Sequence, residues 1–157
     1  MCAYVNMYLT RESVVIKLRL WHYKLIPVLP KEMLVSQWRE CIAIKRQWEL
    51  GTLKHRLVSY VKNYNKALFY EYTLKVRDEM IKRNIKFKDK YIDEIWGYCF
   101  LKGYAIAGLE NYPEHNDRYF KQCYYNLEEK HDRGIISDEE WKPINDLYWE
   151  LDDKGYY

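Results

Sequence analysis

The sequence has few cysteines, no long apolar run and no low-complexity segment, and each absence narrows the class of protein. Its 157 residues include four cysteines, and these are widely spaced and form no C-x-x-C pair: Cys2, Cys41, Cys99 and Cys123. This spacing fits neither a disulfide framework nor a zinc site, so we expect a cytoplasmic protein without a metal or other cofactor. No apolar run approaches the roughly 20 residues that span a bilayer, so we expect a soluble protein without membrane contact.

The sequence is rich in aromatic residues, and its charge is unevenly distributed. It contains 17 Tyr and 6 Trp, which can be half buried and still offer an OH, an NH or a flat face to a partner. Residues 1–90 hold 19 Lys and Arg against 8 Asp and Glu, whereas residues 91–157 hold 7 against 15. A basic first half fits a polyanion such as a nucleic-acid backbone. Alternatively, the two halves pair with each other inside the fold.

The apolar pattern predicts a single all-α domain with three long helices plus shorter helices and loops. We also expect a monomer. The first long helix begins at Pro30 or Lys31 and ends at Gly51. We expect the second over residues 66–83, with Asn84 as a left-handed terminator, and the third over residues 113–130.

The remaining segments give weaker signals. Residues 1–18 lack helical periodicity, so we treat them as an extension of a helical domain over residues 19–157. Residues 86–108 suggest short helices and loops. A capping box over residues 137–140 predicts a last, shorter helix, with Pro143 close enough to its start to bend it.

The first helix carries a charged pair beside its apolar side. Its predicted core stripe is Leu34, Trp38, Cys41, Ile42 and Trp48. With Leu34 at 0° and about 100° per residue, Arg39 lies near 140° and Glu40 near 240°, so both point away from the core. A solvated face is one interpretation. The other is a surface open to another molecule, since the neighbours of Glu40 on the wheel are short or uncharged: Ser36, Ala43 and Gln47.

The segment RLWHYKLIPVLPKEMLVSQWRE, residues 19–40, resembles the start of the pyrimidine dimer DNA glycosylase (endonuclease V) family, and its RLWH start is most similar to the bacterial members. The match is ungapped and includes the aromatic-Arg-Glu triplet Trp38-Arg39-Glu40. A looser resemblance continues through KHRLVSYV at residues 54–61, NKALFYEYTLKVRDEMIKRN at 65–84 and PEHNDRYFKQCYYNLEEK at 113–130, and covers the chain to Arg133.

The resemblance implies a helical base-excision repair enzyme that binds double-stranded DNA with damaged bases and attacks the sugar C1′ of the lesion with its N-terminal amine. A Schiff base forms, the base is released and the strand is cut by β-elimination, which is an abasic-site lyase activity. Glu40 matches the carboxylate that assists these steps, and Arg39 matches an arginine that contacts the nucleic acid. The family's terminal nucleophile corresponds to Arg19.

The position of Arg19 raises the question of which amine reacts, because 18 residues precede it. One hypothesis is that translation begins at Leu18, read as Met from an alternative initiation codon. The nucleophile is then that Met's α-amine, or a lysine such as Lys24; the sequence leaves both open. An α-amine, with a pKa of about 7.7 to 8.0, is a better nucleophile at neutral pH than an ordinary lysine.

Other basic residues are candidate DNA contacts. His22 and Lys24 lie close to the supposed amine, and either touch phosphate or are exposed loop residues. Lys45 and Arg46 follow Glu40 by about one turn. Lys54 and His55 lie in a predicted loop. The aromatic C-terminal end resembles the family's tail, but the acidic residues within it favour packing over DNA contact: Tyr148, Trp149, Tyr156 and Tyr157.

Two other functions compete with the repair glycosylase. A catalytically inactive nucleic-acid-binding module would use the same basic half without chemistry. A helical protein-interaction domain would use the aromatic residues as its interface.

Overall fold

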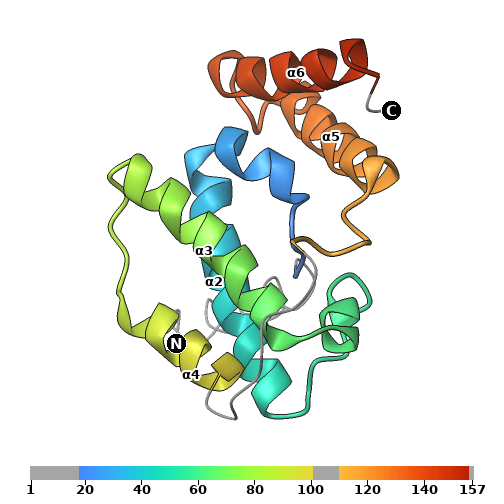
Figure 1. The fold of residues 1–157 in the computed structure, drawn as a ribbon. Helices are drawn as coiled ribbons and strands as arrows, with labels where there is room; N and C mark the ends of the chain where they lie inside the picture. The colour runs from blue at the N-terminus through green and yellow to red at the C-terminus, as the bar shows by residue number, and fades with distance from the viewer. Residues whose placement is uncertain (1–17, 101–109, 156–157) are drawn as a thin grey trace, which may run out of the picture.

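The computed structural model describes residues 18–100 and 110–155, which fold into helices joined by turns and loops (Figure 1). These residues contain no strand, which confirms the predicted all-α class. The predicted extension lies outside the described residues, apart from Leu18. Within the described ranges, no helix is both long and apolar enough to cross a membrane. The elements, with η for a 3-10 helix, are η1 (Tyr23–Val28), α2 (Lys31–Glu49), η2 (Ser59–Asn63), α3 (Lys66–Lys82), α4 (Lys90–Phe100), α5 (Asp117–Asp132) and α6 (Asp138–Asp153).

Local signals set the ends of the first two long helices, as predicted. Helix α2 begins directly after Pro30, and Gly51 follows it with a φ of 72°. Helix α3 is capped by Asn65, whose side chain accepts a hydrogen bond from the Ala67 N–H at 2.9 Å. Asn84 follows α3 with a φ of 56°, the left-handed conformation that asparagine tolerates better than most residues.

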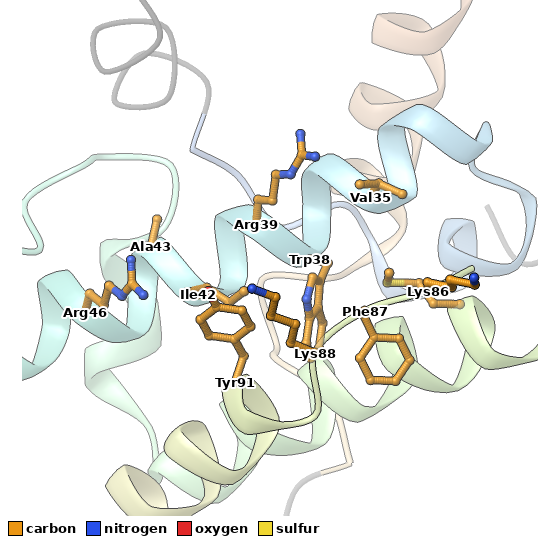
Figure 2. Close-up of a pocket in the computed structure, with 11 residues that line it drawn as sticks. Val35, Trp38, Arg39, Ile42, Ala43, Arg46, Lys86, Phe87, Lys88 and Tyr91 are labelled. Carbon is orange, nitrogen blue, oxygen red and sulfur yellow. The ribbon is translucent and has the colours of Figure 1, made fainter. Parts of the chain in front are cut away.

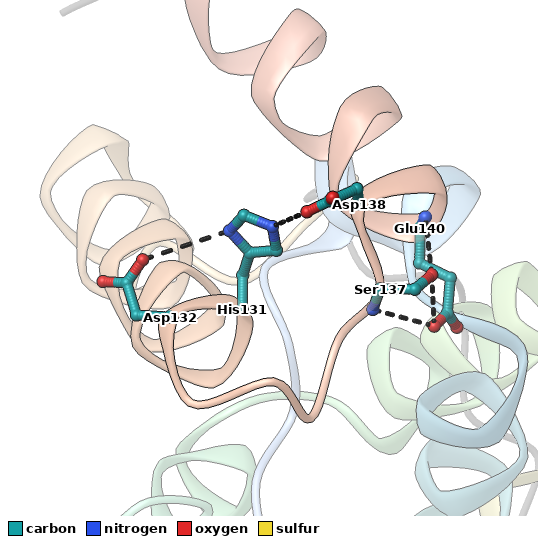
Figure 3. Close-up of polar contacts among 5 residues, drawn as sticks. All are labelled: His131, Asp132, Ser137, Asp138 and Glu140. Atoms are coloured by element: carbon teal, nitrogen blue, oxygen red, sulfur yellow. Dashed lines mark hydrogen bonds and ion pairs between the residues drawn. The ribbon is translucent and has the colours of Figure 1, made fainter.

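Two predictions about the later helices are wrong. Helix α5 begins at Asp117 rather than Pro113, because Asn116 caps it by accepting the Tyr119 N–H at 2.9 Å. Helix α6 has 16 residues, as many as α5, although we expected a shorter helix. Its predicted capping box is present: the Ser137 and Glu140 side chains each accept the other's backbone N–H (Figure 3).

The helices form two groups that share one core. Helices α2, α3 and α4 contact one another, whereas α5 and α6 form a pair at the other end of the molecule (Figure 1). The 3-10 helix η1 contacts both α3 and α6, so it connects the groups. The buried hydrophobic cluster includes residues from every helix, among them Leu25 of η1, Phe69 of α3 and Ile144 of α6.

Arg83, just after α3, holds η1 in place. Its guanidinium donates to the Leu29 carbonyl at 2.6 Å and to the Pro27 carbonyl at 2.8 Å. The same group pairs with Glu79, one turn earlier, at 2.8 Å. Carbonyls at the end of a 3-10 helix lack internal partners, and a guanidinium fork satisfies two of them at once.

We expect Arg83→Met to lower the free energy of unfolding by about 2 kcal/mol, because hydrogen bonds to a charged group are lost at a partly buried position. Urea unfolding measures this change. Arg77→Met is the matched control, since the ion-pair partner of Arg77 among the described residues is the exposed Asp78. An equal loss in both variants would contradict the role of Arg83.

Candidate functional site

The irregular segment of residues 18–22 crosses the interior, and side chains from several helices satisfy its backbone. The Tyr72 hydroxyl of α3 donates to the Trp21 carbonyl at 2.6 Å. The Tyr119 hydroxyl of α5 donates to the Leu20 carbonyl at 2.5 Å. Because a buried backbone group without a partner is costly, these side chains fix the course of the segment.

Gln37 of α2 is the main anchor of this segment, and none of its surface is exposed. Its Oε1 accepts the Trp21 N–H at 2.8 Å and the Tyr72 hydroxyl at 3.2 Å. Its Nε2 donates to the Arg19 carbonyl at 2.9 Å and to Glu40 Oε2 at 3.3 Å. The side-chain amide of Gln37 therefore joins the irregular segment to the candidate catalytic carboxylate of Glu40.

Glu40 is half-buried, so it is neither sealed in the core nor fully solvated. Its Oε2 and the Arg19 carbonyl oxygen bond to the same nitrogen, which keeps them only a few ångströms apart. The Arg19 guanidinium lies 4.6 Å from the centre of the Trp21 ring. Arg39 is exposed, as predicted. The structure thus brings Arg19, Arg39 and Glu40 to one region of α2.

His22 is not a surface residue, contrary to both sequence interpretations. Only 1% of it is exposed, and its ring stacks on His115 at 5.4 Å. Burial lowers the pKa of His22 to about 4 and that of His115 to about 3, so both rings are neutral at pH 7. A neutral buried ring has no charge to offer a phosphate. His115 instead accepts the Tyr23 N–H at 3.3 Å and bonds to the Tyr60 hydroxyl at 2.8 Å.

Lys45 is also buried, with 8% exposed, because its position near 20° on the wheel falls on the core side of α2. Its ammonium pairs with Glu49 at 2.5 Å, which leaves it poorly placed as a surface contact. Arg46 is exposed, and its guanidinium lies 5.8 Å from the centre of the Tyr91 ring.

The other predicted contacts are scattered. Lys24 is half-buried at the start of η1. Lys54 is exposed and His55 half-buried in the loop between α2 and η2, where His55 Nδ1 accepts the Leu57 N–H at 3.3 Å. Tyr148 stacks on Tyr124 with ring centres 3.9 Å apart, so it packs between helices as expected. Trp149 is 54% exposed, and residues 156–157 lie outside the described part of the chain.

Sequence reasoning missed Gln37, although a signal was present. On the wheel used for α2, Gln37 falls near 300°, inside the apolar sector of about 280° to 340°. A polar side chain in that sector indicates a buried hydrogen-bonding role. Tyr72 and Tyr119 carried no comparable signal, because a tyrosine in an apolar stripe is normal core packing.

The helical fold, the anchored segment of residues 18–22 and the Glu40 carboxylate next to the exposed Arg39 define an all-α protein with a polar site on its first long helix. Residues 18–93 match the model of a family described as pyrimidine dimer DNA glycosylase. This match supports the family predicted from the sequence. The match ends within α4, so α5 and α6 lie outside it. No curated protein and no solved structure matches the chain.

We expect Gln37→Glu to destabilise the fold by about 3 kcal/mol at pH 7, because the introduced carboxylate faces Glu40 and the Arg19 carbonyl without a proton to donate. These neighbours raise the pKa of the introduced carboxyl above its unfolded value of about 4.3. The loss of unfolding free energy relative to the native protein is therefore largest above the raised pKa. It becomes smaller as the pH falls through that pKa, because the introduced carboxyl is then protonated. Urea unfolding at several pH values measures the deficit. Gln47→Glu, on the same helix, is the control, and a deficit independent of pH would count against this arrangement.

The buried histidines predict that stability depends on pH. The pKa values of His22 and His115 in the folded protein lie below the unfolded value of 6.5. Above about pH 6.5 the two histidines therefore do not change stability with pH. Below it the unfolded state binds protons that the folded state does not, so stability falls as the pH drops toward 4. Between pH 7 and pH 5 the loss is about 2 kcal/mol for each histidine. We expect His115→Gln to remove one histidine's share of this pH dependence of stability. Chemical unfolding of the native protein and the variant across this pH range tests the assignment, and equal pH dependence in the two proteins would refute it.

Proposed function

We propose that this protein is a DNA repair glycosylase that removes damaged bases from double-stranded DNA and then cleaves the abasic site through a Schiff base assisted by Glu40. The match of residues 18–93 to the family model supports the repair activity. The observation that carries the chemistry is the Gln37 amide, whose Nε2 donates to both the Arg19 carbonyl and Glu40 Oε2. An amine carried at the start of this segment would lie beside the carboxylate.

The proposed reaction needs one amine and one carboxylate. The unprotonated amine attacks C1′ of the lesion, and the glycosidic bond breaks as the base leaves with its electron pair and takes up a proton. Opening of the sugar ring gives an iminium, whose positive charge the Glu40 carboxylate stabilises. The carboxylate then removes a proton from C2′, and the bond from C3′ to its phosphate oxygen breaks. Water hydrolyses the imine and returns the amine.

Two groups are candidates for the amine. One is an α-amine at position 18, which requires translation to begin there. The other is Lys24, which is half-buried and follows the anchored segment. Arg19 contributes its backbone position rather than its side chain, because a guanidinium stays protonated and is a poor nucleophile.

Arg39 supplies the proposed contact with DNA beside the carboxylate. It is exposed and directly precedes Glu40, so its guanidinium can reach a phosphate while the carboxylate faces the sugar. The neighbouring position on this side of α2, Ser36, is short and exposed, which leaves room for the DNA backbone.

Borohydride trapping on a duplex with one abasic site tests this function. We expect a covalent adduct with the native protein, and a rate of trapping about 10²- to 10⁴-fold lower for Glu40→Gln, because the group that handles the protons is lost. Glu32→Gln is the matched control, since Glu32 is an exposed acid at the start of the same helix. Absence of an adduct with the native protein, or an equal loss in both variants, would overturn the proposed chemistry.

The position of the link identifies the amine. Peptide mapping of the reduced adduct distinguishes an α-amine from Lys24, and a comparison of proteins that begin at residues 1 and 18 shows whether the amine must be terminal. A link far from residues 18–24 would contradict the proposed geometry.

A further inference from the structure

Exposed charges of opposite sign gather at two separate places on the molecule. The basic place is a groove between α2 and residues 86–91, with Ile42 on its floor (Figure 2). Its cationic lining residues are all exposed, and none forms an ion pair with another described residue: Arg39, Arg46, Lys86 and Lys88. Because Arg39 directly precedes Glu40, this groove belongs with the candidate site already described.

Helix α6 carries the opposite charge. Residues 138–153 contain seven Asp and Glu against one Lys. The helix packs against α5 and η1, at the end of the molecule away from α4 (Figure 1). Both α5 and α6 lie outside the region that matches the family model. An acidic surface repels a phosphate backbone, so the DNA proposed above does not account for this end of the molecule.

Two large aromatic side chains are exposed on this pair of helices. Trp149 of α6 and Tyr125 of α5 are each 54% exposed. Both lie against the buried Tyr148, with ring centres 5.3 and 6.5 Å from its own. Tyr148 stacks on Tyr124 at 3.9 Å, and the Tyr124 hydroxyl donates to Asn145 Oδ1 at 2.7 Å. The exposed rings therefore rest on a base that both helices hold in place.

Carboxylates lie next to these rings. Asp152 and Asp153 follow Trp149 by three and four positions, so they lie one turn along the same side of α6. Both are exposed, and neither forms an ion pair with another described residue. Hydrogen bonding to Tyr125, burial and the nearby Asp152 carboxylate raise the pKa of Tyr148 to about 12. Asp152 is thus close to the aromatic rings as well as to Trp149 in sequence.

We infer that the surface formed by Tyr125, Trp149, Asp152 and Asp153, the α5/α6 surface, docks an arginine-rich segment of a partner protein. A guanidinium has a flat face that stacks on an indole and a fork of N–H groups that binds carboxylates. An apolar partner would cover Asp152 and Asp153 without neutralising them, which is costly. An arginine-rich segment matches both the rings and the charge. Exposed Trp and Tyr on a fixed base are also the residues that contribute most to protein interfaces.

Fluorescence anisotropy with a labelled peptide of about ten residues, in which arginine alternates with serine, tests the aromatic part of the surface. We expect Trp149→Gln to weaken binding by about tenfold, because a cation–π contact at the centre of the surface is lost. Trp96→Gln is the matched control, since Trp96 lies on α4 and is 50% exposed. Thermal unfolding verifies that both variants are folded. Absence of binding to the native protein, or equal losses in the two variants, would overturn the inference.

A second pair of variants tests the charge. We expect Asp152→Asn/Asp153→Asn to weaken peptide binding by about fivefold at low salt and to reduce its salt dependence. The control is Asp93→Asn/Glu94→Gln, which removes the same charge from exposed residues of α4. A peptide with lysine in place of arginine should bind more weakly, because an ammonium has no flat face. Equal losses in the two double variants, or equal binding of the two peptides, would contradict the inference.

The oligomeric state at low salt separates a partner protein from a second copy of this chain. A second copy could offer its basic groove to the α5/α6 surface. We expect a monomer in sedimentation equilibrium without peptide, and a dimer that Trp149→Gln abolishes would overturn the inference. None of these measurements involves DNA or Glu40, so the docking surface and the proposed repair activity stand or fall separately.

Discussion

The burial of the irregular segment at residues 18–22 is the constraint on which the candidate site depends. This segment belongs to no helix and pairs with no strand among the described residues, so its polar backbone groups need side-chain partners. Gln37, Tyr72 and Tyr119 provide them from three different helices. Because each partner comes from a separate element, the segment takes this path only when all three helices are in place. The position of Glu40 relative to Arg19 is therefore a property of the whole fold.

The same helix serves the core, the candidate catalytic site and the groove on three different sides. Leu34 and Cys41 face the core, Gln37 and Glu40 face the anchored segment, and Arg39 lies at the edge of the groove. A helix repeats every 3.6 residues, so neighbours in sequence point in different directions. The consecutive residues Arg39 and Glu40 therefore point in different directions.

The basic residues of the chain also differ in what they contact. Some basic residues of the first half of the chain are used inside the protein: Arg83 holds the 3-10 helix η1, and Lys45 pairs with Glu49. The basic residues around the groove have no such partners among the described residues. The positive charge available to a polyanion is thus smaller than the sequence total, and part of it lines one groove.

Some features of α2 could be predicted from neighbouring residues, whereas others depend on how the helices pack. Its start after Pro30, its end before Gly51 and the outward direction of Arg39 followed from the sequence, because they depend on neighbouring residues alone. The predicted core stripe was partly wrong. Ile42 lies on the floor of the groove and Ile44 takes a core position, because the packing of α3 and α4 decides which part of the apolar sector is covered. Likewise, the burial of His22 could not be predicted, since His115, on which it stacks, lies 93 positions away in the chain.

The sequence by itself determined the all-α class, the ends of α2 and α3, the capping box of α6 and the triplet that indicates the family. Each depends on backbone conformation or side-chain spacing within a few residues. Only the tertiary structure decided that Gln37 joins Glu40 to Arg19, that Lys45 turns inward, and that residues 86–91 close a basic groove against α2. Those arrangements need partners far apart in the chain, and helix packing alone brings them within hydrogen-bonding or van der Waals distance.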